Sequence, residues 1–229
     1  IVQEGKRAVI DTFAIRGLGD LDSALRMSIL SQLQTKAGSS YTENSLEHDL
    51  AVVVRELRNN GYYRASYTSP VIQISSDGLH DTVVVSVVVG KRKRIGSIVM
   101  EENRNGFRSV SEGTRERQLE LHTGEWYSEE RLEQSRANLM GLGTFEVVLI
   151  DTLVRENKIQ DSILHLRVYT RNSKPHDVGM NLLFYQTAVD NYLNLGLGTT
   201  AQYRNAFGGA QVASATLQYV LQDVGRLTQ

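Results

Sequence analysis

The chain has 229 residues, of which 41% are hydrophobic and 22% are charged, a composition typical of a folded protein of one or two domains. A net charge of −1 provides no electrostatic basis for binding nucleic acid or for general adhesion to anionic lipid. The sequence has no cysteine, which excludes disulfides and thiolate metal sites, and it has no run of 18 apolar residues that would predict a transmembrane helix. It starts at Ile1 without a methionine or signal peptide, so we expect a mature or trimmed product.

Two segments, residues 5–90 and 90–171, read as copies of one unit that share Gly90 at the junction. Each opens with Gly-Lys-Arg, and each later carries a tyrosine, then a hydroxyl residue and, four positions after the hydroxyl residue, a leucine. These are Tyr41, Thr42 and Leu46 in the first copy and Tyr127, Ser128 and Leu132 in the second. The hydroxyl group can cap a helix, and the tyrosine and leucine have the spacing of a hydrophobic staple. The repeat therefore predicts a capped helix at the same place in both copies.

The first copy predicts the element order β-α-α-β-β. Its expected elements are a strand at 6–16, a helix at 21–33, the capped helix ending at Gly61, and strands at 67–75 and 82–89. Strand 82–89 is apolar at nearly every position, which predicts a central, covered strand.

The second copy predicts the same order. Its expected elements are a strand at 94–101, a weaker helix near 111–121, the capped helix ending at Gly143, and strands at 145–155 and 162–170. We therefore expect two α+β domains with a boundary near Gly90, each with a mixed three-stranded sheet and two helices on one face.

Three alternating segments follow, at 178–186, 192–204 and 210–221, joined by turn-rich connections. The second segment has 13 residues, which exceeds the usual strand of ~5–6 residues and suffices for the ~9–11 that cross a bilayer. One face of this segment is apolar, and the opposite face is polar and rich in glycine, as a barrel lumen tolerates. The pattern predicts an antiparallel meander, either part of a transmembrane β-barrel wall or part of a soluble sandwich. The expected lipid-facing residues are Leu193, Leu195, Leu197, Ala201 and Tyr203 in the second segment and Val178, Met180, Leu182 and Phe184 in the first.

No arrangement of residues typical of an enzyme, a cofactor site or a metal site is visible. The five histidines lack metal-ligand spacing, and Glu129 and Glu130 suit the first turn of a helix, where carboxylates complement the dipole. Gly17 and Gly19 fit a plain strand-to-helix turn better than a dinucleotide loop. The basic run 91–94 is interpreted as a solvated junction between modules, with an acidic partner surface or phosphate groups as the alternative.

The order of these features resembles the POTRA-plus-barrel outer-membrane assembly family, of the BamA and TamA type. The similarity rests on the two β-α-α-β-β units, on the segments 57–63 and 83–90, and on the aromatic-glycine turn 204–210. It implies POTRA-like domains at 1–89 and 90–171 and the first strands of an outer-membrane β-barrel at 172–229. Where the family has sixteen barrel strands, this sequence shows three.

The resemblance implies a location in the Gram-negative outer membrane, with POTRA modules in the periplasm. The implied partners are unfolded outer-membrane protein clients, periplasmic accessory proteins or lipoproteins, and outer-membrane lipid, without nucleic acid. Strand 178–186 would form an openable barrel seam. An edge strand can pair with an extended client because its backbone groups are unpaired. The favoured edge comprises Phe145, Val147, Val148, Leu149, Ile150, Asp151 and Val154. The second edge, with Tyr67, Val71, Ile72 and Ile74, is interrupted by Pro70, which cannot donate a ladder hydrogen bond.

Two alternatives stay open from the sequence. A two-partner secretion transporter has the same architecture but serves one secreted client. A scaffold or cell-division protein would use POTRA-like modules purely for binding, although such a protein needs no long lipid-compatible strands.

Overall fold

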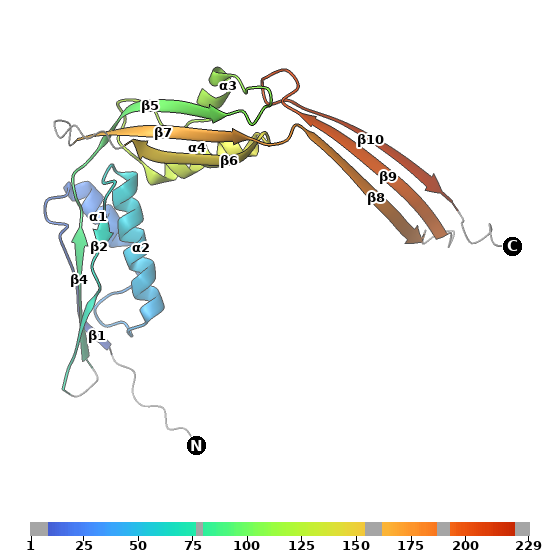
Figure 1. Ribbon diagram of the computed structural model, residues 1–229. Helices are drawn as coiled ribbons and strands as arrows, with labels where there is room; N and C mark the ends of the chain where they lie inside the picture. The colour runs from blue at the N-terminus through green and yellow to red at the C-terminus, as the bar shows by residue number, and fades with distance from the viewer. Residues whose placement is uncertain (1–8, 77–79, 154–161, 187–192, 223–229) are drawn as a thin grey trace. The chain divides into compact units, whose positions relative to one another are not determined.

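The computed structural model describes residues 9–76, 80–153, 162–186 and 193–222 (Figure 1). Val154, a predicted member of the edge strand, lies outside these residues. The chain divides into two compact units. Unit 1 comprises Ile1–Ile98, Leu121–Glu133 and Thr152–Leu166, and unit 2 comprises Val99–Glu120, Gln134–Asp151 and Arg167–Gln229. This division does not follow the predicted boundary at Gly90, and the domain limits 1–89, 90–171 and 172–229 stay a prediction.

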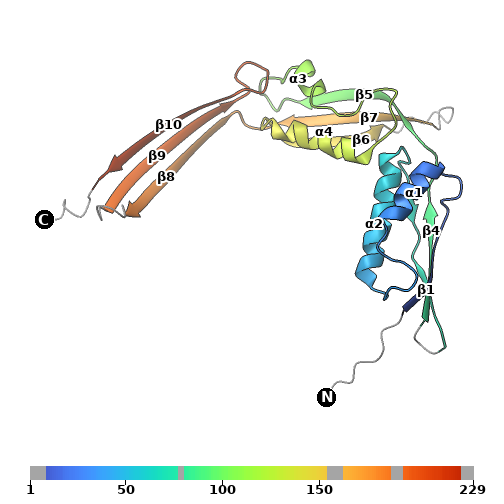
Figure 2. The ribbon, with the colours of Figure 1, turned by 180° about the vertical axis from the view of Figure 1, so that it is seen from behind.

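The first sheet is built around strand β4 (His80–Val88). Strand β1 (Val9–Arg16) pairs with it in parallel, whereas β2 (Ser66–Tyr67) and β3 (Val71–Ile74) pair with it antiparallel. Helices α1 (Ser23–Gln32) and α2 (Glu43–Asn59) lie on one face of this sheet (Figures 1 and 2). The parallel pairing of β1 and β4 requires a crossover connection, which the two helices provide.

Helix α2 begins where the sequence predicts it. The Thr42 hydroxyl accepts a hydrogen bond from the Ser45 backbone N–H, and Tyr41 contacts the core that contains Leu46. A stripe at helical spacing faces the sheet, formed by Leu46, Leu50, Val53 and Leu57. These residues pack with Val83 and Val85 of β4, both of which are fully buried.

One expectation for the first sheet was wrong in detail. The predicted single strand 67–75 is divided into β2 and β3, with Pro70 between them, because proline has no N–H to donate to a ladder. Strand β4 is central, as expected, and one of its faces is fully covered: Asp81, Val83, Val85 and Val87 are buried, while Val88 is exposed.

The second sheet has the strand order β5-β7-β6, with β5 at Arg94–Asn103, β7 at Ile163–Asn172 and β6 at Phe145–Leu153. Helix α3 (Glu112–Glu116) is short, and α4 (Glu129–Gly141) runs alongside the sheet in both ribbon views (Figures 1 and 2). The Ser128 hydroxyl accepts from the Arg131 backbone N–H, which confirms the predicted cap. Leu164, Leu166 and Val168 of β7 are buried as expected. The order β-α-α-β-β thus occurs twice, apart from the division of the fourth element at Pro70.

The third sheet is an antiparallel meander in the order β10-β9-β8. Its strands are β8 (His176–Gln186), β9 (Leu193–Arg204) and β10 (Val212–Leu221). They lie within two residues of the predicted boundaries. Among the described residues, no helix has the length and apolar character needed to span a membrane.

Candidate functional site: two sheet edges and an exposed apolar face

Strand β6 lies at one edge of the second sheet, as the sequence predicts, because among the described strands it pairs with β7 alone. Burial along the strand does not alternate strictly. Phe145 and Val148 are both buried although they are three positions apart, Leu149 is exposed, and Val147 and Ile150 are half-buried. The strand thus presents mixed side chains, and its open backbone edge is the feature suited to binding an extended chain.

Charged pairs link β6 to β7. The Arg167 guanidinium donates two hydrogen bonds to Asp151, from Nη2 to Oδ2 at 2.6 Å and from Nε to Oδ1 at 3.0 Å. These bonds hold the pKa of the Asp151 carboxyl below its ordinary value and raise the pKa of Arg167. Near the other end of β6, Arg171 Nε lies 2.6 Å from Glu146 Oε1. The acidic side chains of β6 are therefore directed to β7, while its outer edge is free of these pairings.

The second predicted edge carries more exposed apolar surface than β6. Val71 is 56% exposed and Ile74 is 70% exposed, and Tyr67 and Ile72 are exposed as well. Pro70 precedes β3 and is not part of it, so the four residues of β3 all have backbone N–H groups. The structure thus offers two edges, of which β3 is the shorter and more apolar.

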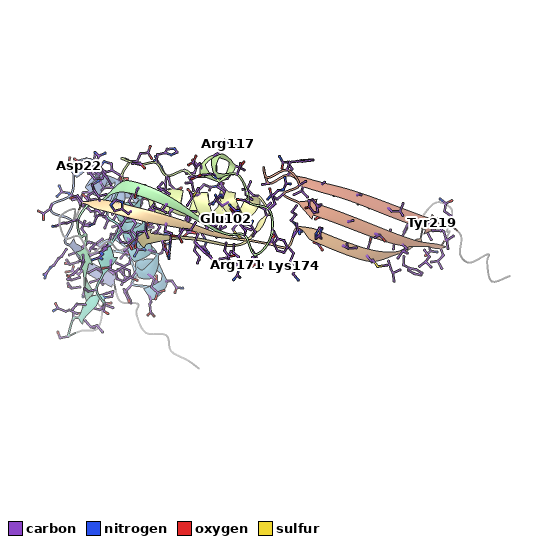
Figure 3. The ribbon with its side chains drawn as sticks, turned by 45° about the horizontal axis from the view of Figure 1, so that its top comes forward. Asp22, Glu102, Arg117, Arg171, Lys174 and Tyr219 are labelled. Atoms are coloured by element: carbon purple, nitrogen blue, oxygen red, sulfur yellow. The ribbon has the colours of Figure 1, made fainter. Side chains whose placement is uncertain are left out.

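The apolar residues of the third sheet share one exposed face. In β8, Val178, Met180, Leu182 and Phe184 are between 69% and 78% exposed. They stand opposite Ala201, Thr199, Leu197 and Leu195 of β9, which in turn stand opposite Ala215, Leu217, Tyr219 and Leu221 of β10. Leu193 and Tyr203 extend the same face at the two ends of β9. All nine predicted lipid-facing residues therefore lie on one continuous apolar surface, with Tyr219 toward the end of β10 remote from the β9–β10 turn (Figure 3).

The opposite face of the third sheet is shaped by glycine. A Cβ on Gly198 would lie 2.3 Å from Asn181 Oδ1, and a Cβ on Gly196 would lie 3.2 Å from the Leu183 Cβ. The side chains of β8 therefore lie across β9 at positions where β9 has none. This arrangement requires the Gly-x-Gly alternation that the sequence shows in β9.

The β9–β10 turn is fastened to the segment that follows β5. The Asn205 side-chain amide donates to the backbone carbonyls of Arg108, at 2.9 Å, and Ser109, at 3.2 Å. The Ser111 N–H donates to the carbonyl of Gly208 at 2.8 Å. Asn205 and Gly208 have φ of 57° and 89°, in the left-handed region that asparagine and glycine tolerate best. Sequence reasoning identified the turn but not this attachment.

A buried carboxylate organises the same segment. The carboxylate of Glu102 on β5, labelled in Figure 3, accepts hydrogen bonds from the Val110 N–H at 3.0 Å, from the Asn172 side-chain amide at 3.0 Å and from the Ser109 hydroxyl. Burial by itself would raise the pKa of Glu102, but these hydrogen bonds and the nearby Arg115 together hold it below its ordinary value. The sequence provided no signal for this role, because the partners are distributed over residues 109 to 172.

Within unit 1, the end of α2 contacts the start of α4. Arg58 Nη1 lies 2.8 Å from Glu129 Oε1, and the Glu130 N–H donates to the Asn59 side-chain oxygen at 2.9 Å. Tyr63 and Tyr127 meet edge to face, and burial raises the pKa of Tyr127. Glu129 and Glu130 lie in the first turn of α4, where the sequence places them, and Glu129 also forms an ion pair with Arg58. Among the described residues, no group of histidine, aspartate or glutamate side chains is arranged to hold a metal ion.

Comparison with known proteins identifies the first α+β element. The family model for POTRA, described as "Surface antigen variable number repeat", matches residues 23–92. Residues 23–92 are therefore similar to a POTRA domain. A curated relative is the outer membrane protein assembly factor BamA of Neisseria meningitidis serogroup B, which is 25% identical over 134 residues. The match covers 56% of this chain but only 16% of the relative.

Solved structures show that the fold extends beyond this POTRA domain. The crystal structure of BamA from Haemophilus ducreyi lacking POTRA domains 1–3 has a TM-score of 0.69 and 16% identity, covering 92% of this chain and 37% of that one. POTRA domains 3–5 of Haemophilus influenzae BamA give 0.56 and 16%, covering 72% and 61%. CdiB from Acinetobacter baumannii gives 0.50 and 14%, covering 97% and 40%. The expected resemblance to the POTRA-containing family of BamA is confirmed, as is a mixed α+β fold.

Proposed function

We propose that this chain is part of an outer-membrane protein assembly factor, with its POTRA modules in the periplasm of a Gram-negative cell. The observation that carries the proposal is the exposed apolar face of β8, β9 and β10, which follows POTRA-like sheets along the chain. Soluble proteins rarely expose a continuous apolar surface of this extent, whereas a lipid-facing strand requires one. The curated relative is itself named an assembly factor.

In this proposal, the third sheet belongs to a membrane β-barrel. An open three-stranded sheet has two unpaired edges, which hydrocarbon does not tolerate, so β8 and β10 pair with further strands in the bilayer. Strand β8, the first in sequence, provides the seam that opens to clients. Its seam residues Val178, Met180, Leu182 and Phe184 face lipid when the seam is closed.

The POTRA modules occupy residues 1–89 and 90–171 in this proposal, and they present edges to extended clients. Strand addition joins a client to the sheet through backbone hydrogen bonds, which are indifferent to the client sequence. The open edge of β6 is the main binding strand, and the apolar side chains of β3 supply a second one. This arrangement suits a receptor for many unfolded barrel proteins.

The test is an assembly assay in phospholipid vesicles that contain the full-length protein. We expect unfolded outer-membrane barrel proteins of several kinds to fold faster than in empty vesicles, as measured by the heat-modifiable mobility of the folded product. Translocation of one secreted client, without acceleration of barrel folding, would support a two-partner secretion transporter instead. If removal of residues 172–229 left the acceleration of barrel folding unchanged, the protein would be a binding scaffold.

A further inference from the structure

Two arginines stack against one tryptophan in unit 1. The guanidinium carbons of Arg92 and Arg94 each lie 4.0 Å from the ring centroid of Trp126, and Arg92 also lies 5.9 Å from the ring centroid of Tyr62. Trp126 is the single tryptophan of the chain. Both arginines belong to the basic run 91–94, for which neither the fold nor the proposed function provides a role.

The two guanidinium groups are held in place by the backbone. Arg92 Nε donates to the carbonyl of Asn60 at 2.7 Å, and Arg94 Nη1 donates to the carbonyl of Gly124 at 2.7 Å. Glycine at position 61 leaves room for the Arg92 side chain, since a Cβ there would lie 2.8 Å from the Arg92 Cγ. Much of the conformational entropy that a long side chain loses on binding is therefore already lost in the free protein.

The charges of both arginines are unpaired within the part of the chain that the structure describes. The neighbouring carboxylates are engaged elsewhere: Glu125 pairs with Arg131 at 2.8 Å and Glu129 with Arg58 at 2.8 Å. Arg92 and Arg94 are exposed, and their remaining N–H groups have no protein acceptor among the described residues. Two fixed cations without a counter-charge attract an anionic ligand.

A cleft of about 410 Å³ opens beside these groups. It is lined by Arg92, Arg94, Arg131 and Trp126, together with Asn59, Asn60, Gly124, Glu125 and Ser128. Stacking uses the faces of the guanidinium groups and leaves in-plane N–H groups, which match the two oxygens of a carboxylate. Tryptophan and arginine in a cleft are also the residues that most often dominate protein–protein binding energy.

We propose that this cleft binds an acidic segment of a partner protein, whose side-chain carboxylates are received by Arg92 and Arg94. A phosphate group fits the cleft less well. Phosphate sites commonly use free backbone N–H groups at a helix N-terminus, but at the start of α4 those of Glu130 and Arg131 already donate to Asn59 and Ser128.

The test uses the 229-residue chain in non-ionic detergent and a labelled eight-residue peptide that alternates glutamate and serine. We expect a saturable rise in peptide anisotropy, accompanied by a change in Trp126 emission and weakened by added salt. Arg94→Gln should weaken binding about tenfold or more, because a charged bidentate contact is lost. The control is Arg55→Gln, which changes an exposed arginine of α2 that does not line the cleft and should leave binding unchanged.

Three results would overturn the proposal: no binding of the glutamate peptide, equal binding by Arg94→Gln, or equal binding of a peptide with glutamine in place of glutamate. Displacement of the peptide by inorganic phosphate or by phosphatidylglycerol vesicles at lower concentration would assign the cleft to phosphate. If Arg94→Gln lowers the melting temperature, Arg94→Lys decides the question. Lysine keeps the charge without the planar guanidinium group, so we expect Arg94→Lys to bind more weakly than the unmodified protein and more tightly than Arg94→Gln. None of these measurements depends on assembly activity.

Discussion

The side-chain amide of Asn205 donates a hydrogen bond to the backbone carbonyl of Arg108 at 2.9 Å, across 97 positions of sequence. A second bond from the same amide reaches the Ser109 carbonyl, and the Asn205 side-chain oxygen accepts from the Ala210 N–H at 3.1 Å. One side chain therefore shapes the β9–β10 turn and attaches it to the segment after β5.

Replacement of Asn205 should release this turn. Asn205→Gly keeps the left-handed backbone conformation while removing all three side-chain hydrogen bonds, so it isolates the contribution of the amide. We expect a loss of roughly 1–3 kcal/mol in the free energy of unfolding, since the Arg108 and Ser109 carbonyls lose a partner. Amide hydrogen exchange should also become faster at Ser111 and Ala210. Phe207→Ala is the matched control, because Phe207 lies in the same turn and is 81% exposed; it should change stability by less than ~0.5 kcal/mol.

Glu102 should make the stability of unit 2 dependent on pH. Its pKa is lowered in the folded state, so its contribution is present above the ordinary pKa of 4.5 and is lost as the pH falls through the folded value. Glu102→Gln should therefore destabilise the protein at pH 7, and the difference from the unmodified protein should shrink below about pH 4.5. Urea unfolding at a series of pH values measures this. Glu116→Gln, which changes an exposed carboxylate on α3, provides the control. A difference that is constant from pH 7 to pH 3 would contradict the assignment.

Local features of the fold were predictable from the sequence, whereas long-range contacts were not. Thr42 and Ser128 cap helices through contacts within three residues, so the pattern reveals them directly. The alternation in β9 likewise predicts which residues share a face. By contrast, the role of Glu102 depends on Asn172, 70 positions away, and polar residues that satisfy a buried group leave no periodic signal. The stacking of Arg92 on Trp126 was invisible for the same reason.

The open edge of β6 should be sensitive to proline at alternate positions. In a strand, successive N–H groups point to opposite sides, so only one parity of residue donates away from β7. Ile150→Pro and Leu149→Pro form a matched pair that samples both parities. We expect the substitution at the outward position to keep the circular dichroism of the fold while weakening anisotropy-detected binding of unfolded barrel peptides. The substitution at the inward position should break the β6–β7 ladder and destabilise the sheet. Unchanged peptide binding by the folded outward-position variant would argue against β6 as the client strand, and Val71→Pro in β3 would then examine the second edge.

Leu195 provides the sharpest test of the membrane assignment. It lies in β9 between Phe184 of β8 and Leu221 of β10, on the exposed apolar face. Leu195→Arg in the full-length protein should cost ~2–4 kcal/mol if the residue lies near the middle of the bilayer, because the charge loses its hydration there. The expected result is a lower yield of membrane-inserted, heat-modifiable protein. Gln202→Arg places the same charge on the same strand but on the opposite face, where Arg204 already pairs with Asp177, and it should insert normally. Because both variants carry the same added charge, a selective effect of Leu195→Arg would identify the apolar face as the lipid-facing one. Equal, normal insertion of both variants would falsify the barrel assignment.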